Sequence, residues 1–148
     1  MMVFNANDTY FHLIRLRIIM SKSALVVESE NLVRSLVANI LHIFQFEVHE
    51  ANDEESAFEL FRRHEHAIAY VYIDYNLRRG SGIRLYQRIR QLDPSVVIVL
   101  ASGMPDNGML LVNHDPNGEL LLKPFSLESF RNTVIRTSVS EECYAVAL

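Results

Sequence analysis

The sequence predicts an α/β fold in which helices cover both faces of one parallel sheet. Short runs rich in Val, Ile and Leu alternate along the chain with segments whose apolar residues recur every three or four positions, as in amphipathic helices. The runs are apolar throughout, which is typical of strands buried on both faces. With 148 residues, 49% of them hydrophobic, the chain suits one compact domain. We therefore expect a doubly wound sheet of five parallel strands.

The first two units each consist of a strand and a helix. A strand is predicted over 24–28, followed by a helix with one apolar face. The residues assigned to that face are Leu32, Val33, Leu36, Val37, Ile40, Leu41 and Phe44. The second strand, 46–51, alternates in polarity and is expected near a sheet edge. Asn52 and Glu55 form a capping-box pattern that predicts the start of the second helix.

The last three units follow the same order. Strands are predicted over 68–74, 96–102 and 119–123. Ser81 is the expected N-cap of the third helix, whose Leu85, Ile89 and Leu92 should face inward. Ser126 is the expected N-cap of the last helix. The segment 104–118 contains two Pro and two Gly residues, so the fourth helix should be short or irregular.

Composition excludes several classes of function. A net charge of -4 gives no electrostatic basis for direct binding to nucleic acid. The single cysteine, Cys143, allows neither a disulfide framework nor a CxxC pair, which favours a cytoplasmic protein. The apolar stretch 10–20 is interrupted by Arg15 and Arg17, so it is neither a membrane span nor a signal peptide. No membrane association is expected.

The predicted domain occupies residues 23–137, between an N-terminal extension, 1–22, and a C-terminal tail, 138–148. Two explanations of the extension stay open. It can be an extra amphipathic element added to the domain, or an upstream addition to a chain that naturally starts at Met20. The short tail predicts no DNA-binding output domain after residue 137.

Four polar residues stand at the ends of predicted strands. They are Glu28, Asp74, Ser102 and Lys123. In an open α/β sheet, ligands bind outside the carboxyl ends of the strands. Two carboxylates, a hydroxyl and an ammonium group are therefore expected at one edge of the sheet.

At these positions the sequence resembles the response regulator receiver domains of two-component signalling. The resemblance covers about residues 23–137 and rests on "ALVVESE", "VYIDYNLRRGSG", "LASG" and "LLLKPF" in that order. It implies a flavodoxin-like (βα)5 fold with strand order 2-1-3-4-5.

The resemblance also implies a role for each strand-end residue. Asp74 would be the phosphoacceptor, Lys123 would contact the phosphoryl oxygens or the resting Asp74, and Ser102 would report phosphorylation to the next helix. Mg²⁺ would be held by Glu28, Asp74 and the backbone carbonyl of Asn76.

Other readings of these residues remain open. Asp74 can be a turn or cap residue after a strand, Lys123 can extend to solvent, and Ser102 can close a local turn. Glu28, like Glu30, can be an acid that interacts favourably with a helix N-terminus.

Two positions depart from the family pattern. Ser29 occupies the place of the second acid, usually Asp, and a hydroxyl is a weaker and uncharged Mg²⁺ ligand. Glu30 can compensate, or the site can bind Mg²⁺ poorly. Leu120 stands where the fifth strand usually has an aromatic residue, so a switch based on an aromatic rotamer is in question.

We therefore expect a stand-alone receiver domain, with no catalysis beyond its own phosphorylation. A histidine kinase or phosphotransfer protein would supply the phosphoryl group. A protein partner would bind the face formed by the fourth helix, fifth strand and fifth helix, and a homodimer is possible. The alternative is a phosphorylation-independent adaptor that kept the fold while its metal site decayed. A flavodoxin-like enzyme or cofactor binder is a more distant third candidate.

Overall fold

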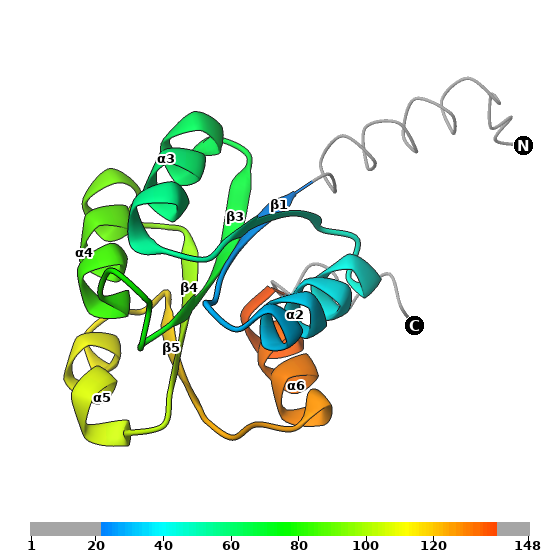
Figure 1. Cartoon of the computed structure of the whole chain (residues 1–148), viewed down its shortest axis with the longest axis vertical. Helices are drawn as coiled ribbons and strands as arrows, with labels where there is room; N and C mark the ends of the chain where they lie inside the picture. The colour runs from blue at the N-terminus through cyan, green and yellow to red at the C-terminus, as the bar shows by residue number, and fades with distance from the viewer. Residues whose placement is uncertain (1–21, 139–148) are drawn as a thin grey trace, which may run out of the picture.

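The computed structural model describes residues 22–138, which form one parallel sheet between two layers of helices (Figure 1). The five strands lie in the order β2-β1-β3-β4-β5, so the predicted doubly wound fold and its strand order are confirmed. The stretch 10–20 and Cys143 lie outside the described residues. Within the described residues, no helix is both long and apolar enough to span a membrane.

The strands and helices alternate along the chain. The strands are β1 (Ser23–Val27), β2 (Glu47–Ala51), β3 (Ile68–Asp74), β4 (Val97–Ser102) and β5 (Gly118–Leu122). The helices are α2 (Asn31–Ile43), α3 (Glu54–His64), α4 (Gly82–Leu92), α5 (Pro105–Asn113) and α6 (Leu127–Ser138). The predicted strands agree with these bounds to within one residue.

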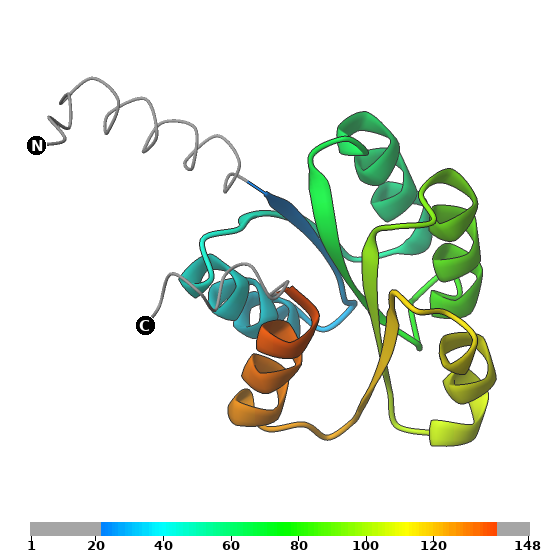
Figure 2. The same cartoon turned by 180° about the vertical axis from the view of Figure 1, so that it is seen from behind.

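Each face of the sheet has its own apolar core. In both views of the ribbon, α3, α4 and α5 cover one face, and α2 and α6 cover the other (Figures 1 and 2). Val71 and Ile73 of β3 belong to the first core, whereas Tyr70 and Tyr72 belong to the second. All four side chains are almost completely buried. The absence of polar alternation in β3 thus reflects burial on both faces.

The predicted start of the second helix is wrong by one residue. The N-cap of α3 is Asp53, whose Oδ1 accepts a hydrogen bond from the N–H of Ser56 at 2.8 Å. Asn52 lies one residue before the cap, and its carbonyl takes part in a loop contact described below. The predicted caps Ser81 and Ser126 are confirmed, since their hydroxyls accept from the N–H groups of Arg84 and Ser129.

Three leucines predicted to face the core are exposed, and Leu36 of α2, at 39%, is the least exposed of them. Leu32 is 87% exposed because it lies on the rim of the apolar face of α2, where Val37, Ile40 and Leu41 are the buried members. Leu92 is 46% exposed because it is the last residue of α4. Helical periodicity identifies the face but not the width of the arc that the sheet covers.

The fourth helix forms despite its unfavourable composition. Pro105 is in the first turn of α5, where it costs no helical hydrogen bond. A Cβ atom on Gly108 would lie 2.9 Å from a methyl carbon of Leu100 and 3.0 Å from one of Leu120. The glycine therefore allows α5 to approach β4 and β5 closely.

Candidate functional site

The carboxyl edge of the sheet brings three of the four strand-end residues into direct contact. Asp74 ends β3, Glu28 follows β1, and Lys123 follows β5. The Nζ atom of Lys123 donates hydrogen bonds to Asp74 Oδ1 at 2.8 Å and to Glu28 Oε2 at 2.9 Å. One ammonium group therefore lies between two carboxylates from neighbouring strands. This corrects the alternative in which Lys123 extends freely to solvent.

Glu28 is completely buried, and both of its carboxylate oxygens accept hydrogen bonds. Its Oε1 accepts from the N–H of Glu30 at 3.0 Å. Its Oε2 accepts from Lys123 and, at 3.4 Å, from the hydroxyl of Tyr72. Burial and the neighbouring carboxylates raise the pKa of Tyr72, so its phenol keeps the proton that it donates. A buried carboxylate requires such partners, because an unpaired charge inside a protein is costly.

The charges of Asp74 and Lys123 depend on each other. Burial raises the pKa of Asp74, and the hydrogen bond from Lys123 opposes part of that shift. Burial alone would lower the pKa of Lys123, but hydrogen bonds to Asp74 and Glu28 outweigh it and raise the pKa. Lys123 is therefore charged at neutral pH. Its charge balances one of the two carboxylates and leaves the cluster negative overall.

The chain turns sharply after Asp74. The N–H of Gly82 donates to the carbonyl of Tyr75 at 3.1 Å, which closes the loop of residues 75–81. A Cβ atom at Gly82 would lie 2.3 Å from the carbonyl oxygen of Asp74, so only glycine fits there. A main-chain hydrogen bond from Asn76 opposes a small part of the rise that burial causes in the pKa of Asp74. The role of the Asn76 carbonyl as a metal ligand stays a prediction.

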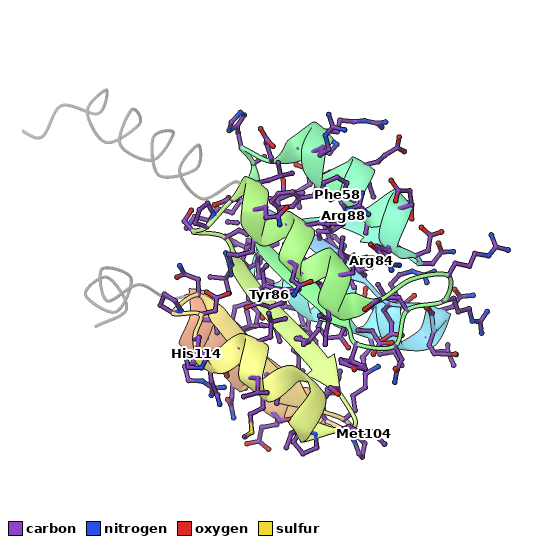
Figure 3. All side chains as sticks on the ribbon, turned by 90° about the vertical axis from the view of Figure 1, so that its left-hand side faces the viewer. Phe58, Arg84, Tyr86, Arg88, Met104 and His114 are labelled. Atoms are coloured by element: carbon purple, nitrogen blue, oxygen red, sulfur yellow. The ribbon has the colours of Figure 1, made fainter. Side chains whose placement is uncertain are left out.

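The hydroxyl of Ser102 closes a local turn. This is one of the two roles predicted for it, the other being to report phosphorylation to the next helix. Its hydroxyl donates to the carbonyl of Met104 at 2.9 Å and accepts from the N–H of Met104 at 3.1 Å. Asp74 pairs in register with Ala101, so Ser102 on the adjacent strand lies one residue beyond the partner of Asp74. Its hydroxyl is thus near the site but bound to the segment that opens α5 (Met104 is labelled in Figure 3).

Ser29 makes contacts that the sequence did not suggest. Its hydroxyl accepts from the N–H of Arg78 at 2.9 Å and donates to the carbonyl of Asn52 at 3.3 Å. Glu30 is exposed and lies 3.6 Å from the guanidinium of Arg78. No local pattern identifies these partners, because they come from the loops that follow three different strands.

Glu54 is a second residue that sequence reasoning missed. It lies in the first turn of α3 with its side chain only 4% exposed, and it accepts hydrogen bonds from Arg84 and Arg88 of α4. Its Oε2 also accepts from the N–H of Ser81 at 3.1 Å. Figure 3 shows Arg84 and Arg88 along the side of α4 that meets α3. The hydrogen bond from Arg84 is the largest cause of a pKa near 2 for Glu54.

The spacing of Arg84 and Arg88, four residues apart on one helix, was the only signal for this contact. It indicates one helical face, but it does not indicate which acid lies opposite.

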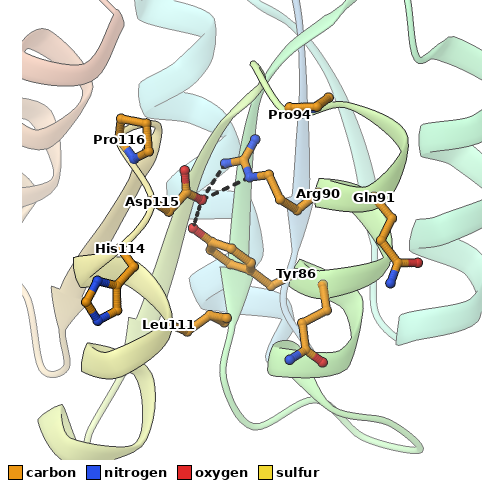
Figure 4. A pocket seen from close by; sticks show the side chains of 9 residues that line it. Tyr86, Arg90, Gln91, Pro94, Leu111, His114, Asp115 and Pro116 are labelled. Atoms are coloured by element: carbon orange, nitrogen blue, oxygen red, sulfur yellow. Dashed lines mark hydrogen bonds and ion pairs between the residues drawn. The ribbon is translucent and has the colours of Figure 1, made fainter.

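A cleft of about 720 Å³ lies between α4 and α5, away from the strand-end cluster (Figure 4). Asp115 at its base accepts hydrogen bonds from Tyr86 and Arg90. Arg90 also donates to the carbonyls of Asp93, Val96 and Asn117. The charged groups of this cleft therefore connect secondary-structure elements to one another.

The described residues, 22–138, contain no group of three or more His, Cys, Asp or Glu side chains arranged to hold a metal ion. At the carboxyl edge, Glu28 and Asp74 are the two acids whose carboxylates contact Lys123. This donor set fits Mg²⁺ poorly, since Glu28 is enclosed by protein donors and Ser29 is bound to two loops.

Comparison with known proteins identifies the class. The model of the response regulator receiver domain family matches residues 24–135. The chain therefore belongs to the receiver domain family of two-component signalling, whose members are signalling proteins rather than classical enzymes.

Solved structures of receiver and chemotaxis proteins have the same fold. The chemotaxis protein CheY4 of Vibrio cholerae superimposes with a TM-score of 0.69 at 18% identity, covering 79% of this chain and 98% of that protein. The receiver domain of NtrX from Brucella abortus gives a TM-score of 0.68 at 25% identity, covering 80% of this chain and 100% of that domain. A third similar chain belongs to the CheX-CheY-BeF3-Mg+2 complex of Borrelia burgdorferi, with a TM-score of 0.70 and 19% identity over 80% of this chain and 90% of that one.

Among curated proteins, the transcriptional regulatory protein SrrA of Staphylococcus aureus is 26% identical over 107 residues. The match covers 72% of this chain but only 44% of SrrA. This chain thus spans less than half the length of that relative.

Proposed function

We propose that this receiver domain accepts a phosphoryl group on Asp74 from a histidine kinase or phosphotransfer protein and signals through a protein partner. The contact of Lys123 with both Asp74 and Glu28 is the observation that carries the proposal. It supplies a nucleophilic carboxylate and a cation within hydrogen-bond distance at the edge where α/β folds bind ligands.

In the proposed reaction, a carboxylate oxygen of Asp74 forms a bond to phosphorus. The bond between phosphorus and the donor's histidine nitrogen breaks, and the electron pair stays on the imidazole, which then takes a proton. The ammonium group of Lys123 stabilises the negative charge on the phosphoryl oxygens. Because burial raises the pKa of Asp74, its ionised form is a stronger nucleophile than an exposed aspartate.

Ser102 connects the acceptor to α5 in this proposal. A phosphoryl oxygen on Asp74 offers a charged acceptor that competes with the carbonyl of Met104 for the Ser102 hydroxyl. Rotation of the hydroxyl toward the phosphoryl group would release the turn that opens α5. This coupling needs no aromatic residue at Leu120.

The proposed output surface includes α5, β5 and α6. Met109 and Leu110 of α5 and Leu122 of β5 are large apolar residues that the fold leaves exposed. In the Borrelia burgdorferi complex, a chain of similar fold is bound to CheX, which supports a protein as the partner class. Action in the cytoplasm, as a stand-alone domain or as a homodimer, stays a prediction of the sequence.

Receiver domains generally bind Mg²⁺ at the phosphorylation site. In this chain Glu28, Asp74 and the Asn76 carbonyl are the predicted ligands, and Ser29 replaces the second acid. Because the donor set fits the ion poorly, the reaction above is assigned to Asp74 and Lys123 alone.

The experiment is incubation of the protein with a small phosphodonor, with and without Mg²⁺, followed by intact mass measurement. We expect an adduct of roughly 80 Da, the mass of one phosphoryl group, that is absent from Asp74→Asn. Glu59→Gln, which removes an exposed carboxylate of α3, should keep the adduct. An adduct that survives in Asp74→Asn would contradict the assignment.

A phosphorylation-independent adaptor is the second candidate, and the enclosure of Glu28 together with the loop contacts of Ser29 favours it. In that case neither a small phosphodonor nor a kinase would modify Asp74, and Asp74→Ala would leave partner binding intact. The mass measurement therefore separates the two functions.

A further inference from the structure

We propose that Ser29 is a positioning residue that fixes the acceptor loop by hydrogen bonds, and that Lys123, rather than a divalent cation, is the counter-ion shared by Glu28 and Asp74 in the resting site. The term acceptor loop, for residues 75–81, rests on the proposed function of Asp74. The contacts themselves do not depend on it.

The first support is the junction of three loops at Ser29. Ser29 follows β1, Asn52 follows β2, and Arg78 lies in the acceptor loop after β3. The hydroxyl of Ser29 uses its donor on the Asn52 carbonyl and an acceptor position on the Arg78 N–H. An isolated parallel bridge between Asp53 and Arg78 joins the second and third loops at the same place.

The second support is an independent anchor at the other end of the acceptor loop. Glu54 accepts from the N–H of Ser81, and a Cβ atom on Gly80 would lie 2.6 Å from the Cβ of Glu54. The loop is thus held at Arg78 by Ser29 and at Ser81 by Glu54. Protein hydrogen bonds therefore hold the loop at two points after Asp74.

The third support is the enclosure of Glu28. Mg²⁺ binds oxygen ligands at about 2.0–2.1 Å in octahedral geometry and usually keeps several waters. Glu28 has no exposed surface, and the ammonium of Lys123 already lies 2.9 Å from its Oε2. A hydrated cation would have to displace Lys123 and the Tyr72 hydroxyl to reach this carboxylate.

The residue type at position 29 matters because its side chain must donate to one loop and accept from the other. An aspartate could accept from the Arg78 N–H, but it could not donate to the Asn52 carbonyl. It would also place a second negative charge beside Glu28, which a cation would then need to balance. Alanine would provide neither hydrogen bond, whereas threonine would provide both.

The positioning role is tested by amide hydrogen exchange of the whole chain, measured by NMR. We expect Ser29→Ala to speed the exchange of the Arg78 amide by about fivefold or more, and Ser29→Thr to keep it near the wild-type rate. Ser95→Ala removes a hydroxyl from another loop and should leave the Arg78 amide unchanged. An unchanged Arg78 rate in Ser29→Ala would overturn the role.

The charge balance is tested by titrating the same proteins with MgCl2 at constant ionic strength, with the amide shifts of residues 28–30 and 74–78 as the readout. The wild type should give no saturating shift up to about 10 mM, whereas Ser29→Asp should saturate because a carboxylate ligand is restored. Saturation of the wild type below about 1 mM would overturn the proposal, as would Ser29→Asp binding no better than the wild type. Phosphorylation is not part of either readout, so failure of Asp74 to accept a phosphoryl group would leave these results interpretable.

Discussion

At the scale of single residues, the site is a small set of buried charges whose partners are fixed. Lys123 is the shared partner of Asp74 and Glu28, and its side chain is 27% exposed. Glu28 has no exposure to solvent, so its negative charge depends on this lysine and on Tyr72. Removing the lysine from such a cluster leaves buried negative charge without compensation.

Lys123→Met should therefore destabilise the protein by about 2–4 kcal/mol, since Glu28 would stay buried with no cation. Urea denaturation at neutral pH measures the loss. The double variant Lys123→Met/Glu28→Gln should recover part of the stability, because the uncompensated charge is gone. Lys22→Met, which changes an exposed lysine, should alter the free energy of unfolding by less than about 0.5 kcal/mol. No recovery in the double variant would contradict the role assigned to Glu28.

The raised pKa of Asp74 predicts a stability that depends on pH. An acid with a higher pKa in the folded state binds its proton more readily when folded, so it costs stability as the pH rises above the ordinary value of 3.8. Asp74→Asn lacks this cost. Relative to the wild type, the variant should gain stability between pH 4 and pH 7, as measured by thermal unfolding at each pH. A variant that becomes relatively less stable over this range would contradict the direction of the shift.

At the scale of the elements, the contact between α3 and α4 fixes the acceptor loop from outside. Glu54 of α3 accepts from Arg84 and Arg88 of α4 and from the backbone of Ser81. Arg88 also lies 3.8 Å from the ring centre of Phe58, and Figure 3 labels both side chains at this contact. The two helices and the loop therefore form one connected unit on this face of the sheet.

Glu54→Gln should weaken this unit in a pH-dependent way. The pKa of Glu54 falls from 4.5 to about 2, so its stabilisation is complete above pH 4.5 and is lost as the pH falls toward 2. The shift corresponds to at most about 3–4 kcal/mol, and the exposure of Arg84 reduces this to on the order of 1–2 kcal/mol at neutral pH. Chemical denaturation at pH 7 and pH 2.5 measures the difference.

Glu59→Gln, on the exposed side of the same helix, is the matched control for that measurement. A deficit of Glu54→Gln that is as large at pH 2.5 as at pH 7 would show that the ionised carboxylate is not the source of the stability.

At the scale of the whole molecule, stability comes from two cores that share one sheet. Leu100 of β4 is completely buried in the core under α3, α4 and α5. Val99 and Ala101, its neighbours on the same strand, belong to the core on the opposite face. A cavity made by a substitution in one of these cores would therefore be separated from the other core only by the backbone of β4.

Leu100→Ala should cost about 3 kcal/mol, because it removes buried methyl groups and leaves a cavity in a packed core. Leu110→Ala is the control, since Leu110 is 76% exposed on α5 and should cost less than about 0.5 kcal/mol. Both values come from urea denaturation curves of the two variants. Equal costs would contradict the assignment of the core.

The local sequence was sufficient for the fold because strand and helix patterns depend on nearby residues. The apolar run 68–74 and the cap Ser81 were predicted correctly for this reason. Leu32 was misplaced, since the apolar period of a helix does not reveal how much of its surface the sheet covers. The cap of α3 was misplaced because Asn52 and Asp53 are both good N-cap residues, and the loop geometry favours the second.

The sequence by itself determined the doubly wound fold and the set of polar residues at the strand ends, because a parallel sheet places the carboxyl ends of its strands at one edge. Only the tertiary structure decided the partner of each residue. Lys123 binds Glu28 from 95 positions away, and Ser29 meets Arg78 across 49 positions. Such pairs follow from the order and packing of the strands, which bring distant loops together independently of any local pattern.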